Sequence, residues 1–246
     1  MSHEPPLLPK SPLIGHAAPV RPPADRHWHA FHNDSAFTVW ILSEDGVSFK
    51  ASRCRLTSRT LLLASRRPPS PLLNEITALN LKYPAAVIAI FLDMVHSEHP
   101  LKIDGITHST ARSLYSLTAH AHCSAELIEQ SRQLLYVSSR QCPLDLLLFA
   151  SSQNDIEIGR DALMLIHERQ RVESDFPLAQ DWKRCFEQLE PLWALELGRL
   201  INLETEANPA ERCNWLNVRA EFDPTYDHLA SLLPYASPPE VVWRLD

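Results

Sequence analysis

Side chains that commonly bind metal ions lie close together in the sequence around residue 120. His120, His122 and Cys123 are almost contiguous, and His108 precedes them. A zinc site needs three or four ligand atoms that converge on the ion at about 2.0–2.3 Å. Residues two apart on a helix point roughly 200° away from each other, so His120 and His122 cannot face one ion. We therefore predict a surface histidine and a buried thiol here, and no metal site.

The side chains of a hydrolytic triad are present in number, since the chain has twelve histidines together with many serines and acidic residues. A triad also needs a strained nucleophile turn and oxyanion donors, and the sequence contains the pattern of neither. His167-Glu168 lacks the second histidine of the zinc-protease signature. We predict no catalytic residues and a non-enzymatic protein. The alternative that stays open is a small helical, hydrolase-like enzyme without a recognisable motif.

Glycine content and net charge exclude further classes of function. The chain has only five glycines, which are widely separated. Loops that hold nucleotide phosphates need several glycines close together, so the backbone can approach the anion. We therefore predict no nucleotide-binding loop and no cofactor. The net charge of −7 also argues against direct binding of nucleic acids.

The cysteines and the apolar segments indicate the cellular compartment in which we expect the protein. The five cysteines form no Cys-x-x-Cys pair, and their odd number favours free thiols. With no apolar leader at the N-terminus, we expect a reducing compartment, the cytoplasm or the nucleus. The longest apolar run, Ala85–Leu92, is too short to span a bilayer, so we expect no membrane association.

The elements that must position any functional side chain begin after a proline-rich segment. Residues 1–34 contain seven of the twenty prolines, and we predict a disordered tail there. Its P-x-x-P spacings suit either a polyproline ligand or, as we favour, a plain spacer. Strands are predicted at 37–42, 47–51 and 75–81, because these segments are β-branched, aromatic or alternating, with a turn at Asp45-Gly46 between the first two. Between them lie a short helix around Leu56 and a proline-rich loop at 65–71.

The rest of the chain is predicted to be helical. The segment 85–95 is apolar almost all round, which is typical of a buried helix. Later segments have apolar residues at steps of three and four. Helices are expected at 107–122, 125–137, 144–152, 156–167, 180–206 and 226–233, with a short strand at 101–103. Pro191 predicts either a kink or two separate helices within 180–206.

The order of these elements resembles the BTB/POZ domain, and particular residues carry the resemblance. Phe49-Lys-Ala-Ser-Arg53 is similar to the family's Phe-x-Ala-His-Arg, and Leu56 and Thr60 follow at the family's spacing. The other matching segments are the strand Ile76–Leu81, the buried helix Ala85–Val95, the short strand Leu101–Ile103 and the helical hairpin Thr107–Leu135. The helical segments near Pro143 and at Ile158–Ile166 resemble the extension of fungal members.

The resemblance implies an α+β fold and a binding function. It implies a three-stranded sheet with helices in a domain at 35–140, and an all-helical extension at 141–246. Its members are protein–protein interaction modules that bind another copy or a different protein, some as adaptors of cullin-type ubiquitin ligases. The chain departs from the family where Ser35-Ala36-Phe37 contains no Asp and where Ser52 replaces the usual His. These departures leave Arg53 without the acidic partner that forms a charged dimer pocket in many members.

Two aromatic groups are candidates for partner binding. Trp40, in the first predicted strand, is the candidate anchor of an apolar contact surface that also involves Ser52 and Arg53. The helical stripe of Trp182, Phe186, Leu189 and Trp193 suits either a groove for a partner helix or packing inside the extension. We expect packing, because exposed tryptophans at this density favour aggregation.

Overall fold

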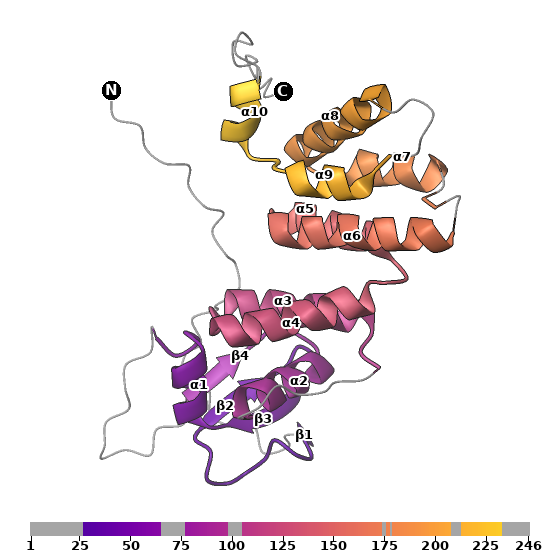
Figure 1. Cartoon of the computed structure of the whole chain (residues 1–246). Coiled ribbons are helices and arrows are strands. Elements are labelled where there is room, and N and C mark those ends of the chain that lie inside the picture. The colour runs from indigo at the N-terminus through magenta and orange to yellow at the C-terminus, as the bar shows by residue number, and fades with distance from the viewer. Residues whose placement is uncertain are drawn as a thin grey trace, which may run out of the picture. The chain divides into compact units, whose positions relative to one another are not determined.

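The computed structural model describes residues 27–64, 77–97, 105–173, 176–177, 179–207 and 213–232. The chain divides into two compact units, Met1–Leu135 and Tyr136–Asp246. Figure 1 shows both, and each is described by itself. The boundary between the units falls inside a helix, whereas the sequence placed it after residue 140.

Unit 1 (Met1–Leu135) is built on a small mixed sheet, which makes the fold α+β. The sheet has the order β1-β3-β2-β4. Its strands are β1 (His27–Trp28), β2 (Val39–Leu42), β3 (Val47–Ala51) and β4 (Thr77–Asn80). β2 and β3 form an antiparallel hairpin, and β1 and β4 are parallel to β3 and β2 respectively. Gly46 has a φ of +83°, a left-handed conformation that glycine adopts without steric cost in the hairpin turn.

The sheet has four described strands, not the three that were predicted. The additional strand is β1, where His27 and Trp28 pair with Val47 and Ser48 of β3. Residues 27–34 therefore belong to the fold, although they were assigned to the disordered tail. A two-residue strand is too short to show any periodicity in the sequence, which is why it was missed. The remainder of the predicted tail lies outside the described residues.

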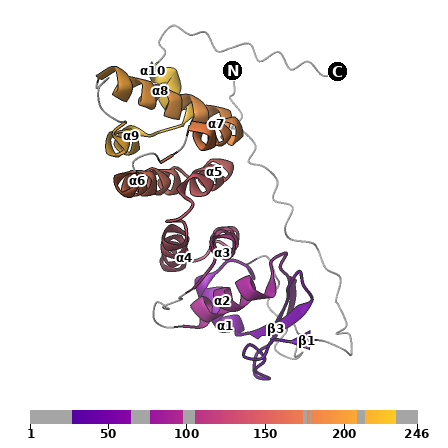
Figure 2. The same ribbon diagram turned by 90° about the vertical axis from the view of Figure 1, so that its right-hand side faces the viewer.

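Alternation along the hairpin gives the sheet two different faces. Val39 and Ile41 of β2, with Phe49 and Ala51 of β3, are fully or almost fully buried on the inner face. This face packs against α2 (Ala85–His96), whose Val87, Ile88, Phe91, Leu92 and Val95 are buried in the same core. Figures 1 and 2 show α1 (Arg53–Arg59) and α2 on this side of the sheet. The side chains of alternate residues lie on the opposite, outer face.

Two further helices complete the core of unit 1. They are α3 (His108–His120) and α4 (Ala125–Ser138), close to the predicted hairpin. Thr107 caps α3 by accepting a hydrogen bond from the N–H of Thr110. Thr118 and Ser131 join α3 to α4 through a buried hydroxyl–hydroxyl hydrogen bond of 2.8 Å. The predicted loop at 65–71 and the strand at 101–103 lie outside the described residues.

Unit 2 (Tyr136–Asp246) is helical throughout its described part. Its helices are α5 (Pro143–Gln153), α6 (Ile156–Val172), α7 (Ala179–Gln188), α8 (Pro191–Ala207), α9 (Trp215–Glu221) and α10 (Tyr226–Leu232). α5 and α6 lie side by side in both views. Asn154 turns the chain between them with a φ of +52°, and Asp155 caps α6. Pro191 separates two helices, because it begins α8, so the alternative of a single kinked helix is wrong.

The tryptophan stripe of unit 2 packs inside the unit, as predicted. Trp193 is 2% exposed, and its indole Nε1–H donates to Oδ1 of Asn154 at 3.1 Å. Its ring meets Phe222 edge-on, with centroids 5.1 Å apart. Gly159 allows α6 to approach this ring closely, since a Cβ there would lie 2.5 Å from Trp193. Trp182 packs edge-on against Trp215 of α9.

Candidate interaction surface

Two tryptophans meet on the outer face of the sheet in unit 1. Trp28 of β1 and Trp40 of β2 pack edge to face, with ring centroids 5.4 Å apart and planes at 82°. The ammonium of Lys50 in β3 lies 4.9 Å from the centroid of the Trp28 ring. A cation over an indole face at this distance is attracted by the ring's electron density. Three adjacent strands thus supply one aromatic and cationic cluster.

The same face extends along the hairpin with a smaller apolar side chain. Leu42 lies two residues after Trp40, so its side chain is on the same side of the sheet, and it is 40% exposed. Trp28, Trp40 and Lys50 are each half-buried. On β4, Ala78 pairs with Trp40 and Asn80 pairs with Leu42, which places both on this face. We name Trp28, Trp40, Leu42 and Lys50 the outer-face patch.

Ser52 and Arg53 do not join Trp40 in one surface. Arg53 donates a hydrogen bond to Oγ1 of Thr77. Thr77 pairs with Val39, whose side chain is in the core, so Thr77 lies on the inner side of the sheet. Ser52 caps α1 by accepting from the N–H of Arg55 at 3.4 Å. The sequence proposed one surface that includes the first strand and the first helix; Ser52 and Arg53 lie at the start of that helix, on the other side of the sheet from Trp40.

Asp34 lies just before the position where the family usually has its Asp, and it has another role here. Asp34 accepts a hydrogen bond from the N–H of Ala36 on its Oδ1 at 2.8 Å. Its carbonyl accepts from the N–H of Phe37 at 3.1 Å. These are contacts of an Asx turn, which shapes the loop that enters β2. Arg53 donates to the hydroxyl of Thr77, where the family's dimers have a carboxylate.

Three histidines cluster behind β3, a grouping that the sequence did not suggest. The rings of His29 and His32 stack with centroids 5.2 Å apart, and His32 and His96 are 5.9 Å apart. His29 also stacks on Phe49 of β3 at 4.8 Å. Nε2 of His32 lies 3.0 Å from Oδ1 of Asp93. The cluster joins residues from the chain before β2 to α2, which are about sixty positions apart and share no motif.

Burial and hydrogen bonding disfavour the protonated form of two of these histidines. The N–H of Ser52 donates to Nε2 of His96 at 3.2 Å, so that nitrogen carries no proton. Burial lowers the pKa of His96, and the nearby His32 and Arg55 lower it further. Nδ1 of His29 accepts from the backbone N–H of Phe31 and His32. Burial and the neighbouring His32 lower the pKa of His29.

His120, His122 and Cys123 have the exposure that was predicted for them. His120 and His122 are exposed, and Nδ1 of His120 lies 3.1 Å from the hydroxyl of Tyr83. Cys123 is buried, and its burial raises the pKa of the thiol to about 12. A thiol with this pKa is protonated at neutral pH and is a poor metal ligand and nucleophile.

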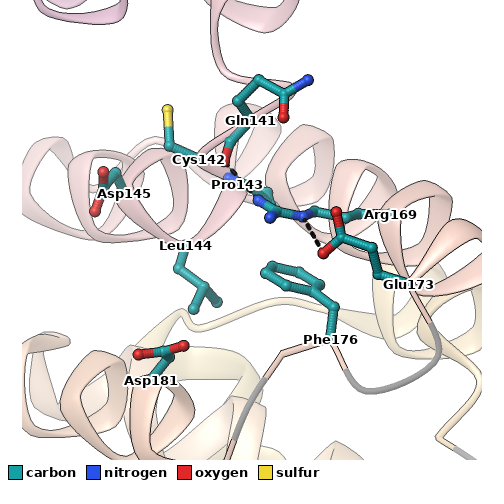
Figure 3. A pocket seen from close by; sticks show the side chains of 9 residues that line it. All are labelled: Gln141, Cys142, Pro143, Leu144, Asp145, Arg169, Glu173, Phe176 and Asp181. Carbon is teal, nitrogen blue, oxygen red and sulfur yellow. Dashed lines mark hydrogen bonds and ion pairs between the residues drawn. The ribbon is translucent and has the colours of Figure 1, made fainter.

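Unit 2 contains an open cavity of about 360 Å³ between the start of α5, the end of α6 and α7. Figure 3 shows Arg169 in its wall. The guanidinium donates to the carbonyl of Gln141 at 2.5 Å and to Oε2 of Glu173 at 3.1 Å. It also lies over the ring of Phe176 at 4.3 Å. Arg169 thereby links the end of α6 to the residues before α5, a structural role.

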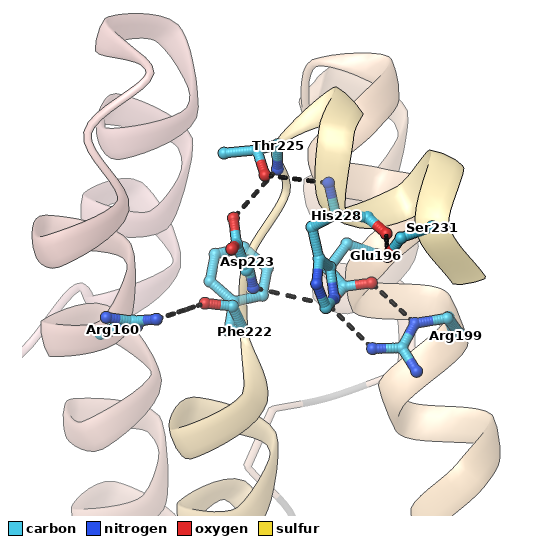
Figure 4. A network of polar contacts seen from close by, with 8 residues as sticks. All are labelled: Arg160, Glu196, Arg199, Phe222, Asp223, Thr225, His228 and Ser231. Carbon is cyan, nitrogen blue, oxygen red and sulfur yellow. Dashed lines mark hydrogen bonds and ion pairs between the residues drawn. The ribbon is translucent and has the colours of Figure 1, made fainter.

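A second polar group in unit 2 surrounds Glu196, whose side chain is completely buried (Figure 4). Arg199 makes two hydrogen bonds to its carboxylate, at 2.7 and 2.9 Å. The N–H of Asp223 donates to Oε1 at 3.4 Å, and Nε2 of His228 lies 3.5 Å from the same atom. These contacts tie α10 and the segment after α9 to α8. A buried carboxylate satisfied in this way stabilises local packing.

Comparisons with known proteins indicate no function for this chain, so the proposed function rests on the contacts described above. No protein-family model matches the chain, and no curated protein matches it either. Among the described helices, none combines the length and the apolar character needed to cross a bilayer. The outer-face patch is the one group of described residues that pairs a predicted site residue, Trp40, with exposed apolar surface on adjoining strands.

Proposed function

We propose that this protein is a protein–protein interaction module that acts by binding and not by catalysis. The observation that carries the proposal is the outer-face patch, where Trp28 and Trp40 meet on a sheet whose opposite face is the core. The resemblance to BTB/POZ domains in element order and in Phe49–Arg53 supports the same function. Its partner is a protein, without direct contact to nucleic acid or insertion into a membrane.

The composition of the patch suits protein contact. Tryptophan is enriched among the residues that dominate binding energy, because it buries a large area and loses few rotamers. Lys50 adds a charge at the margin of the aromatic pair, where it can orient an approaching partner. A stable complex buries about 1,200–2,000 Å² in total, so the partner must also cover neighbouring residues of the sheet.

The position of Arg53 favours this face over the charged pocket of the family's dimers. Its guanidinium is bonded to the neutral Thr77, and Asp34 is engaged in a turn. We therefore propose contact through the outer face, with a different protein or with a second copy. A role as an adaptor in a larger assembly, such as a cullin-type ligase in the cytoplasm or nucleus, is the specific form that the resemblance suggests.

The proposal is tested by substitutions on the outer face. Trp40→Ala removes the proposed anchor, and Leu42→Glu places a charge on the same face at an exposed position that leaves the core intact. Leu195→Glu is the matched control, since Leu195 is an exposed leucine (54%) of α8 in unit 2. Sedimentation measures self-association, and quantitative affinity capture compares the proteins retained by each variant.

The expected result is loss of self-association or of specific retained proteins with Trp40→Ala and Leu42→Glu, but not with Leu195→Glu. Circular dichroism checks that each variant is folded. If both outer-face variants behave as the wild-type chain does in sedimentation and in capture, the outer face is not the contact surface.

A further inference from the structure

The segment that carries Trp28 to the outer face is held against the rest of unit 1 by histidines. Residues 27–37 contact β3 through the backbone, where the N–H of His29 donates to the carbonyl of Ser48 and the N–H of Lys50 donates to that of His32. The side chains of His29 and His32 add ring contacts on the inner side, with each other and with Phe49 of β3. Trp28 is next to His29, so the position of this tryptophan depends on these contacts.

His96 connects the same cluster to the start of α1. Its ring contacts His32 and Phe37, with centroids 5.9 and 5.4 Å apart. Its Nε2 accepts the N–H of Ser52, the residue that caps α1. Protonation of Nε2 would turn it into a donor that faces the N–H of Ser52, so this hydrogen bond would be lost. Protonation of Nδ1 in His29 would remove the acceptor for the N–H groups of Phe31 and His32 in the same way.

The charges around the cluster do not balance added protons on His29 and His96. The N-terminal segment contributes His29 and His32, α2 contributes His96 and Asp93, and α1 contributes Arg55. β3 contributes the apolar ring of Phe49. Of these groups only Asp93 is an acid, and its side chain is half exposed. Adding protons therefore creates repulsion between rings that are 5–6 Å apart.

We propose that His29 and His96, which both contact the ring of His32, form a proton-sensitive latch that holds residues 27–37 against β3 and α2 when these two rings are neutral and releases them when they are protonated. The latch regulates the outer-face patch, because release moves Trp28 away from Trp40. This consequence for binding rests on the proposed function, whereas the latch itself concerns the free protein.

The direction of the pH dependence follows from the lowered pKa of His29 and of His96. The folded segment binds fewer protons than the unfolded segment at any pH near these values. The stabilisation is complete above the ordinary histidine pKa of about 6.5 and decreases as the pH falls below it. Release is therefore expected in mild acid.

Hydrogen exchange of the free, full-length chain tests the latch. Protection factors, which correct for the pH dependence of intrinsic exchange, are measured at pH 7.5 and 5.5. The expected result is a severalfold loss of protection at pH 5.5 in residues 27–37 and at the N–H of Ser52, with α3 and α8 unchanged. In His29→Gln/His96→Gln, whose amides do not titrate in this range, the dependence disappears. His120→Gln, an exposed histidine outside the cluster, retains it.

Two results would overturn the latch. One is protection in residues 27–37 that does not change between the two pH values, and the other is a change that persists in the double variant. If the double variant does not fold, NMR titration of the wild-type chain decides: protonation of His96 without a shift of the Ser52 amide signal contradicts the latch. All these measurements lack a partner, so they separate failure of the latch from failure of the outer-face patch.

Discussion

Two groups of tryptophans in this protein have opposite relations to solvent. In unit 2, Trp193 is buried between α6 and α8, with Asn154 bonded to its indole and Phe222 against its ring. In unit 1, Trp28 and Trp40 pack on each other on the outer side of a sheet and stay half-buried. The difference teaches that aromatic content alone does not identify a binding surface. What matters is whether another element of the same chain covers the rings.

The largest expected effect on stability is at Trp193, the buried tryptophan of unit 2. Trp193→Ala removes a ring from a packed interior and leaves a cavity, together with an unpaired Asn154 side chain. We expect a loss of about 3–5 kcal/mol in the stability of unit 2. Hydrogen exchange of α6 and α8 measures this loss within the unit. A loss below about 1 kcal/mol would mean that the ring is not an essential part of this core.

A smaller effect is expected where α6 approaches the same ring. Gly159→Ala places a Cβ 2.5 Å from Trp193, a distance that requires the ring or the helix to move. Overpacking of this kind costs about 1–3 kcal/mol. Gly198→Ala on α8 is the matched control, since the nearest atom to its Cβ would be at 3.9 Å. Thermal unfolding followed by circular dichroism should therefore separate the two variants, and equal midpoints would contradict the close approach.

The smallest expected effect on stability is at the half-buried pair of Trp28 and Trp40 in unit 1. Trp40→Ala should cost unit 1 about 0.5–1.5 kcal/mol, comparable to the loss of one aromatic pair, because Trp40 is half-buried and is not part of the hydrophobic core cluster. Chemical denaturation measures the cost. If Trp40→Ala instead unfolds unit 1, Trp40 is a core residue and the comparison between the two groups fails.

Much of the fold could be predicted from the sequence because its elements are periodic. The helices at 85–96, 108–120 and 125–138 follow their apolar spacing closely, and the hairpin follows its alternation and its Asp45-Gly46 turn. β1 was missed because two residues have no period. α9 was missed because its seven residues contain only two buried side chains, Trp215 and Val218.

The candidate site was predictable only in part. Alternation along β2 places the side chain of Trp40 on the other face of the sheet from those of Val39 and Ile41. Alternation along β3 likewise places Lys50 on the other face from Phe49. The partner ring Trp28 comes from a strand that no local pattern indicates. Ser52 and Arg53 were chosen through the family resemblance, which also predicted the helix that begins there, and they lie on the other side of the sheet from Trp40. The histidine cluster exists only through tertiary contacts, so no spacing in the sequence predicts it.

Site-specific photo-cross-linking in cells tests the central claim most directly. A photoreactive amino acid replaces Leu42 in the outer-face patch or, as the control, Leu195 on α8, and the adducts of the two chains are compared. We expect a discrete adduct, with a partner protein or a second copy, at position 42 but not at 195, and its loss when Trp40→Ala is added. Absence of any adduct at position 42, or one that is unchanged by Trp40→Ala, would contradict binding through the outer face.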